Sequence, residues 1–275
     1  MEGSPWQAWE AHLAVLVGAV YFVLARQTFV RHKDDKLLLL SEMGLASVFA
    51  VIAIPIAWKW EWITIGWSVE AAVLLAIGFR LREPLARWAG RGLLVAAGLR
   101  ALIYDMDLRS AYALIVNTRS LSILATLAIM AGAMRLIRAG ENELTDEELK
   151  MADVIPVFWN FLLLAWLSVE ARDYLKFVYI PLHPARSLSQ CTTVADSVLW
   201  TLYAAVLMAV GLLKGVKGAR IGAEILFGLT ALKVVLVDMS ELSLGARVIS
   251  FLVVGGLILF VSYFVQRRRS EAEAA

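Results

Sequence analysis

Trp67 to Asp107 reads WSVEAAVLLAIGFRLREPLARWAGRGLLVAAGLRALIYDMD, and Trp200 to Ser240 reads WTLYAAVLMAVGLLKGVKGARIGAEILFGLTALKVVLVDMS. A constant offset of 133 residues aligns the two stretches without a gap and leaves 13 of 41 positions identical. Polar positions are among the matches, so shared apolar composition is a poor explanation for them. The matched pairs include Gly78 with Gly211, Arg87 with Arg220, Arg100 with Lys233 and Asp105 with Asp238. We interpret this pattern as an internal duplication, which sets the frame for the whole fold.

The composition is that of an integral membrane protein. Of 275 residues, 60% are hydrophobic and 18% are charged, whereas soluble domains are about 45–50% apolar and about 25% charged. The net charge of +2 does not indicate nucleic acid as a partner, because the basic residues lie between apolar runs, where membrane topology explains them. The lone Cys191 can form no intramolecular disulfide. No CxxC or HExxH motif and no His/Cys cluster occurs, so we expect no metal and no cofactor.

About nine apolar runs approach the roughly 20 residues that a helix needs to cross a bilayer. They lie near 8–26, 37–58, 62–80, 91–106, 114–137, 152–172, 194–213, 220–238 and 247–266. The fourth and eighth runs are short, and they carry Arg100 and Lys233. After the first run, the remaining eight form two groups of four. Because four is an even number, both groups enter the membrane in the same direction. We therefore predict an all-α integral membrane protein with about nine transmembrane helices, namely one leading helix and two parallel four-helix repeats.

This arrangement divides the chain into five segments. They are a leading transmembrane helix with a basic loop (1–36), the first four-helix repeat (37–138), a polar linker (139–150), the second four-helix repeat (151–268) and a polar tail (269–275). Within the linker, Thr145-Asp-Glu-Glu148 has the pattern of a capping box and predicts a short helical turn. Basic residues gather in alternate connections, including the linker and the C-terminal Arg267-Arg268-Arg269. The positive-inside rule then places the N-terminus outside and the C-terminus in the cytoplasm.

Each repeat keeps an aspartate and an arginine across a short turn near the predicted outer face: Asp105 with Arg119, and Asp238 with Arg247. Both aspartates end a helix, where the dipole disfavours an anion unless a cation lies nearby. Two interpretations stay open. The pairs are structural clasps that fix a helical hairpin, or they form a polar site for an anionic or zwitterionic ligand.

Three ionisable residues lie deeper: Glu70, Arg100 and Lys233. A charge at membrane depth costs about 2.5–3.5 kcal/mol on insertion scales, so each needs a partner or a function. Glu70 is matched by Tyr203 in the second copy, so the fold itself does not require its charge. Glu70 could pair with Arg100 as a static ion pair, or serve as a proton or coupling-ion site. Lys233 has no matching glutamate and should face an aqueous cavity or a carboxylate of another span.

Several stretches resemble a bacterial family of predicted membrane proteins, domain of unknown function 2339. They are Trp67-Ser-Val-Glu70-Ala-Ala-Val-Leu-Leu-Ala-Ile-Gly78, Leu232-Lys233-Val-Val-Leu-Val-Asp238-Met-Ser240, Arg247-Val-Ile-Ser250-Phe-Leu and Ser262-Tyr263-Phe-Val-Gln266-Arg267. The resemblance covers roughly residues 40–268 and corresponds to the C-terminal portion of longer members. It implies a multi-pass protein of the bacterial inner membrane. It implies no biochemical activity.

Two classes of function remain. The first is a transporter, or a protein that handles a lipid or small molecule, with a ligand site between the two repeats that involves Glu70, Arg100 and Lys233. The second is a non-transporting scaffold or accessory subunit of a membrane complex in the cell envelope. The expected partners are the lipid bilayer, with a lipid or small-molecule ligand in the first case and a membrane protein in the second. No catalytic motif is present, so we do not expect an enzyme, and an integral membrane enzyme ranks third behind these two classes.

Overall fold

The computed structural model describes residues 5–31, 36–58, 61–107, 112–151 and 153–234, together with nine positions between 248 and 263. Every regular element within these ranges is a helix. The chain divides into two compact units, Met1–Leu162 and Leu163–Ala275. The helix α7 (Val154–Tyr174) contributes residues to both units.

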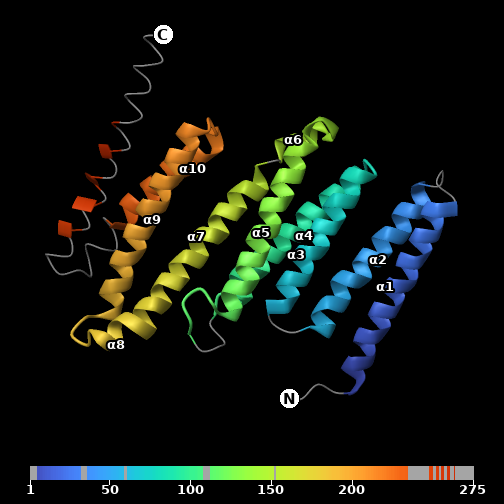
Figure 1. Ribbon diagram of the computed structural model, residues 1–275, viewed down its shortest axis with the longest axis horizontal. Coiled ribbons are helices and arrows are strands. Elements are labelled where there is room, and N and C mark those ends of the chain that lie inside the picture. The colour runs from blue at the N-terminus through green and yellow to red at the C-terminus, as the bar shows by residue number, and fades with distance from the viewer. Residues whose placement is uncertain are drawn as a thin grey trace, which may run out of the picture. The chain divides into compact units, whose positions relative to one another are not determined.

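The first unit consists mainly of antiparallel helices. α1 (Pro5–Arg31) pairs with α2 (Lys36–Ala57), α3 (Glu61–Arg80) pairs with α4 (Pro84–Tyr104), and α5 (Thr118–Ala139) packs against α3. Figure 1 shows that helices consecutive in the chain run in alternate directions in this unit, so that α3 and α5 run the same way. The α1–α2 hairpin packs mainly on itself, and α2 makes a smaller contact with α3.

The polar connection after α5 is ordered by local hydrogen bonds. It contains a 3₁₀ turn (η1, Glu141–Glu143) and the short helix α6 (Asp146–Lys150). Thr145 caps α6, and both halves of the capping box are present. This confirms the helical turn predicted from Thr145-Asp-Glu-Glu148.

The second unit contains the end of α7, a π-helical turn (η2, Leu175–Tyr179), the single turn α8 (Ile180–Leu182) and a long hairpin. The hairpin is formed by α9 (Leu188–Leu213) and α10 (Lys217–Lys233), which pack against each other.

The first helices of the two hairpins, α3 and α9, bury matching positions. Five residues of α3 that are buried have a buried counterpart 133 positions later in α9. These pairs are Thr64 with Ser197, Ser68 with Thr201, Ala71 with Ala204, Leu75 with Met208, and Gly78 with Gly211. The spacing of three or four residues places them on one face of each helix, the face that packs in the hairpin.

The glycine at the tip of each hairpin permits close approach of the two helices. A Cβ atom on Gly78 would lie 2.6 Å from Cγ of Arg87, and a Cβ atom on Gly211 would lie 2.6 Å from Cγ of Arg220. Both distances are far below van der Waals contact, so no larger residue fits either position without a shift of the backbone.

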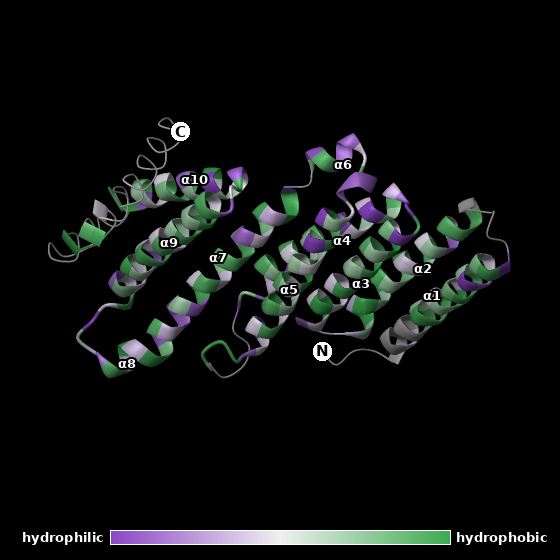
Figure 2. Cartoon of the chain, turned by 45° about the horizontal axis from the view of Figure 1, so that its top comes forward, coloured by the Kyte–Doolittle hydropathy of each residue, from purple (hydrophilic) through white to green (hydrophobic). Residues whose placement is uncertain are grey.

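Six stretches among the described residues are long and apolar enough to cross a membrane. They fall on α1, α2, α3, α5, α7 and α9. Figure 2 shows hydrophobic residues along these helices, with hydrophilic residues concentrated at α6. Two other predicted spans are helices that are too charged or too short to be counted among these six. α4 carries Arg87, Arg91 and Arg100, and the described part of α10 has only 17 residues. The ninth predicted span, 247–266, lies largely outside the described residues. The structure thus supports several membrane-spanning helices.

Candidate functional site

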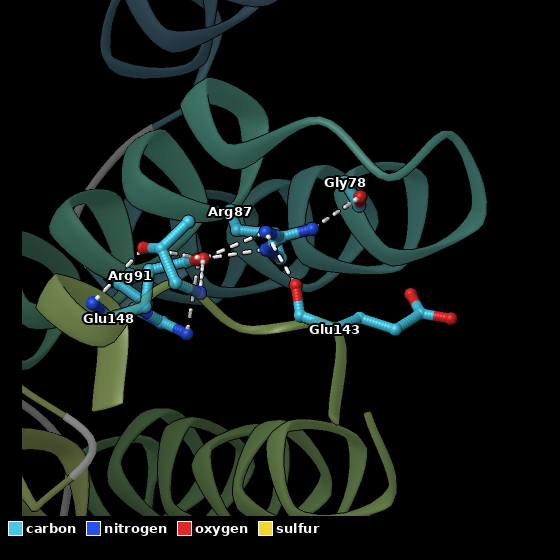
Figure 3. Close-up of polar contacts among 6 residues, drawn as sticks. Gly78, Arg87, Arg91, Glu143 and Glu148 are labelled. Atoms are coloured by element: carbon cyan, nitrogen blue, oxygen red, sulfur yellow. Dashed lines mark hydrogen bonds and ion pairs between the residues drawn. The ribbon is translucent and has the colours of Figure 1, made fainter. Parts of the chain in front are cut away.

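A buried ion pair joins the start of α4 to α6. Arg87 is 1% exposed, and its guanidinium donates from Nε to Oε1 of Glu148 and from Nη2 to Oε2, each at 2.7 Å. Figure 3 shows the two side chains facing each other, with the carbonyls of Gly78 and Glu143 accepting further hydrogen bonds from Arg87. Such a two-bond pair is the strong form of an arginine–carboxylate contact.

Glu148 is held in place by its own helix turn. Its Oε2 accepts hydrogen bonds from the backbone nitrogen of Thr145 at 3.0 Å and from the Thr145 hydroxyl at 3.2 Å. α6 lies in the hydrophilic connection before the apolar part of α7. The hydrogen bonds from Arg87 lower the pKa of the Glu148 carboxyl to about 2, against the opposing effect of burial. The carboxylate is therefore charged at any physiological pH.

Arg91 lies one turn further along α4 and is also buried, at 5% exposure. Its Nη2 is 3.4 Å from Oε1 of Glu148, and its guanidinium lies over the ring of Trp88 at 5.5 Å. None of its guanidinium nitrogens has a hydrogen-bond partner among the described residues. One carboxylate is thus shared by two buried guanidinium groups, so the three side chains carry a net charge of +1. We did not predict this cluster, because the sequence pattern places both arginines in a cytoplasmic loop and gives no sign of a partner 61 positions away.

The structure pairs Arg100 with Asp105, and this differs from the predicted pairing of Asp105 with Arg119 and from the possible pairing of Glu70 with Arg100. Nη1 of Arg100 is 3.0 Å from Oδ1 of Asp105, and Thr64 donates to Oδ2 of the same carboxylate at 2.6 Å. Arg100 therefore pairs with Asp105, five residues away along the chain, and not with Glu70. Arg119 is not the ion-pair partner of Asp105; its Nη1 donates at 3.2 Å to the backbone carbonyl of the next residue, Met106. The physical reason is distance along the chain: Arg100 lies about one and a half turns before Asp105, the C-cap residue of α4, and its long side chain spans that separation.

Lys233 has a comparable position in the α9–α10 hairpin. Its Nζ donates to the Ser197 hydroxyl at 2.7 Å and to the carbonyl of Thr193 at 3.1 Å. Ser197 is the counterpart of Thr64, to which Arg100 donates in the first hairpin. The predicted pair Asp238 and Arg247 lies outside the described residues.

A second ion pair that the sequence did not reveal joins α7 to α9. Nη2 of Arg172 is 2.7 Å from Oδ2 of Asp196, which is 4% exposed. Arg172 itself is half exposed, so the pair joins a buried carboxylate to a guanidinium at the surface of the structure. The sequence contained one indication of this pair: an arginine ends one predicted span and an aspartate lies near the start of the next.

Glu70 lies apart from all of these pairs and lines a cavity. Its Oε1 accepts a hydrogen bond from Ser47 of α2 at 2.7 Å, while its buried Oε2 has no hydrogen-bond partner among the described residues. The cavity has a volume of about 530 Å³ and is lined by α1, α2 and α3. Small and apolar side chains form most of its wall, including Ala14, Gly18, Ala46, Ala50, Ala53 and Val73.

No three His, Cys, Asp or Glu side chains lie together in a way that could hold a metal ion in the part of the chain that the structure describes. The side chains assembled at these sites can pair charges, bind apolar groups and accept a hydrogen bond at Glu70.

The model of the family described as predicted membrane protein, DUF2339, matches residues 100–268. The chain belongs to this family. The matched segment begins at Arg100 and contains Lys233 and the α9–α10 hairpin, whereas Glu70 and the cavity precede it. DUF2339 membership establishes a membrane protein without a known activity. Comparisons with curated proteins and with solved structures found no match.

Proposed function

We propose that this DUF2339 protein binds a lipid or small apolar molecule within the membrane, in the cavity between α1, α2 and α3. The observation that supports the proposal most strongly is the cavity itself. Its volume of about 530 Å³ lies within the range of about 300–1,000 Å³ typical of small-molecule sites, and such sites combine an apolar wall with few polar groups. Glu70 and Ser47 supply the polar groups here.

We further propose that the protein is a duplicated, multi-pass protein of a bacterial inner membrane, with the N-terminus outside and the C-terminus in the cytoplasm. The shared buried positions of α3 and α9 support a common origin for the two hairpins. The alternation of basic connections supports the orientation.

In this proposal Arg100 and Lys233 stabilise the two hairpins and do not contact the ligand. Each donates to a matched hydroxyl within its own hairpin, Thr64 or Ser197. These contacts within each hairpin support a structural role for the two residues, which is what the second class of function, a scaffold or accessory subunit, requires of them. The cavity at Glu70 favours ligand handling for the whole protein, whether or not the ligand is transported.

Native mass spectrometry of the protein released from gently solubilised membranes tests ligand handling. We expect a lipid or small molecule in stoichiometric amount on the wild type. Ala50→Phe fills the cavity and should remove it, because Ala50 lines the wall. Ala128→Phe on the exposed face of α5 is the matched control and should retain the ligand. A stoichiometric protein partner with no small ligand on the wild type would favour the scaffold and contradict the proposal.

A further inference from the structure

The cavity has one charged group on its wall. Among the described residues that line it, Glu70 alone carries a charge and Ser47 alone carries a hydroxyl. The remaining lining residues are alanine, glycine, aliphatic, methionine or aromatic side chains. Any molecule in the cavity therefore meets a single carboxylate in apolar surroundings.

Among the residues that the structure describes, no basic side chain pairs with Glu70. Ser47 donates a neutral hydrogen bond to Oε1, and Oε2 has no hydrogen-bond partner within the same described part of the chain. Arg100, the nearest predicted partner, is occupied by Asp105 and Thr64. Glu70 is the tenth residue of the 20-residue helix α3, and at 1.5 Å per residue it lies about 14 Å along it, near mid-span.

An unbalanced carboxylate at that depth is costly unless it takes up a proton or a cation comes to it. Phospholipid headgroups stay at the membrane surface, so their charges do not reach mid-span. A cation that carries its own apolar shell does reach it. Building on the proposed function of this cavity, we propose that it selects lipophilic cations, with the positive charge facing the carboxylate of Glu70 and the apolar shell against the small side chains of α1 and α2.

Two ions of the same shape and opposite charge test the selectivity. Equilibrium dialysis of the full chain in an uncharged detergent, with protein-free micelles as the baseline, would measure saturable binding of tetraphenylphosphonium and of tetraphenylborate. We expect the cation to bind at least about tenfold more tightly than the anion, a difference of about 1.4 kcal/mol. This comparison uses the wild type alone, so it does not depend on how any variant folds.

Substitutions of Glu70 and of a control residue test whether Glu70 causes the preference for the cation. Glu70→Gln keeps the shape and an acceptor for Ser47 but removes the charge, and it should weaken binding of tetraphenylphosphonium at least about tenfold. Glu70→Asp keeps the charge and should retain the preference for the cation. Glu42→Gln is the matched control, because Glu42 is a buried carboxylate of α2 that does not line the cavity, and it should leave binding unchanged.

The outcomes separate the two proposals. Equal binding of both ions, lost in Ala50→Phe, would overturn cation selectivity and leave the apolar site standing. Cation binding that survives Glu70→Gln would also overturn the selectivity at this site. Binding of neither ion, with a neutral lipid retained in native mass spectrometry, would overturn the cation proposal alone. Binding of neither ion together with no retained lipid would overturn both.

Discussion

Arg87 and Glu148 show how a charged pair is held inside a largely apolar bundle. Removing two charges from water is costly, and the cost is offset only when the geometry is good and the remaining donors and acceptors are satisfied. Here the guanidinium bonds both carboxylate oxygens and two backbone carbonyls. The pattern at Thr145 predicted the turn that presents Glu148. It could not predict Arg87 as the partner, because the pair depends on how the hairpin and the linker pack.

Glu148→Gln should destabilise the protein by about 3–5 kcal/mol, because it leaves Arg87 and Arg91 buried without a counter-charge. Thermal unfolding in detergent measures the loss. Arg82→Gln is the control: Arg82 is 80% exposed and lies 3.6 Å from Glu143, so its loss should change stability by less than about 1 kcal/mol. Equal effects of the two substitutions would contradict the buried pair.

The same carboxyl gives a dependence on pH. The folded pKa of Glu148 is about 2, below the ordinary value of 4.5, so the fold favours the charged form. Its contribution to stability is full above about pH 4.5 and declines as the pH falls towards 2. The difference in melting temperature between wild type and Glu148→Gln should therefore narrow as the pH is lowered from 6 to 3. A constant difference over that interval would be inconsistent with this titration.

At the level of elements, the two hairpins are specified by a small set of positions. Small and hydroxyl residues on one face of α3 and α9 allow close packing, and a cation near the end of α4 or α10 donates to a hydroxyl on the facing helix. The matched positions were visible in the sequence, including Arg100 with Lys233. Their partners were not, because Thr64 and Ser197 lie just before the aligned stretches and hydroxyls are weak signals. The pairing of Asp105 with Arg119 was wrong for a related reason: alignment shows which residues recur and not which contact.

Gly78→Ala should destabilise the α3–α4 hairpin, because the new methyl group would overlap Arg87. Overpacking of this kind typically costs about 1–3 kcal/mol. Gly132→Ala in α5 meets nothing within 4 Å, so the higher helix propensity of alanine should leave stability unchanged or raise it by up to about 1 kcal/mol. Thermal unfolding of both variants is the measurement, and equal melting temperatures would contradict the close approach.

At the level of the whole molecule, the membrane class and most helices followed from apolar run length. Eight of the nine predicted runs coincide with α1, α2, α3, α4, α5, α7, α9 and α10. The cavity could not be predicted, because it arises from incomplete packing of the α1–α2 hairpin on α3. A gap between packed helices has no signature in the amino-acid sequence. Glu70 was recognised as unusual from its divergence at a matched position. Only the structure showed which residues surround Glu70.

The orientation can be tested by labelling single cysteines in a Cys191→Ser background. Glu147→Cys in α6 should react with a membrane-impermeant maleimide only in broken cells, because the linker is predicted to be cytoplasmic. Leu182→Cys, at a position that is 72% exposed, should react in intact cells. The reverse pattern would invert the topology.

The most direct measurement for the ligand site is residue-level mapping of a photoactivatable, apolar lipid analogue in native membranes. The account predicts that peptides lining the cavity in α1, α2 and α3 are labelled above the level of the exposed face of α5. It also predicts that Ala50→Phe removes this excess while Ala128→Phe does not. Labelling spread evenly over the apolar surface, and unchanged by Ala50→Phe, would contradict the claim that the cavity binds a ligand.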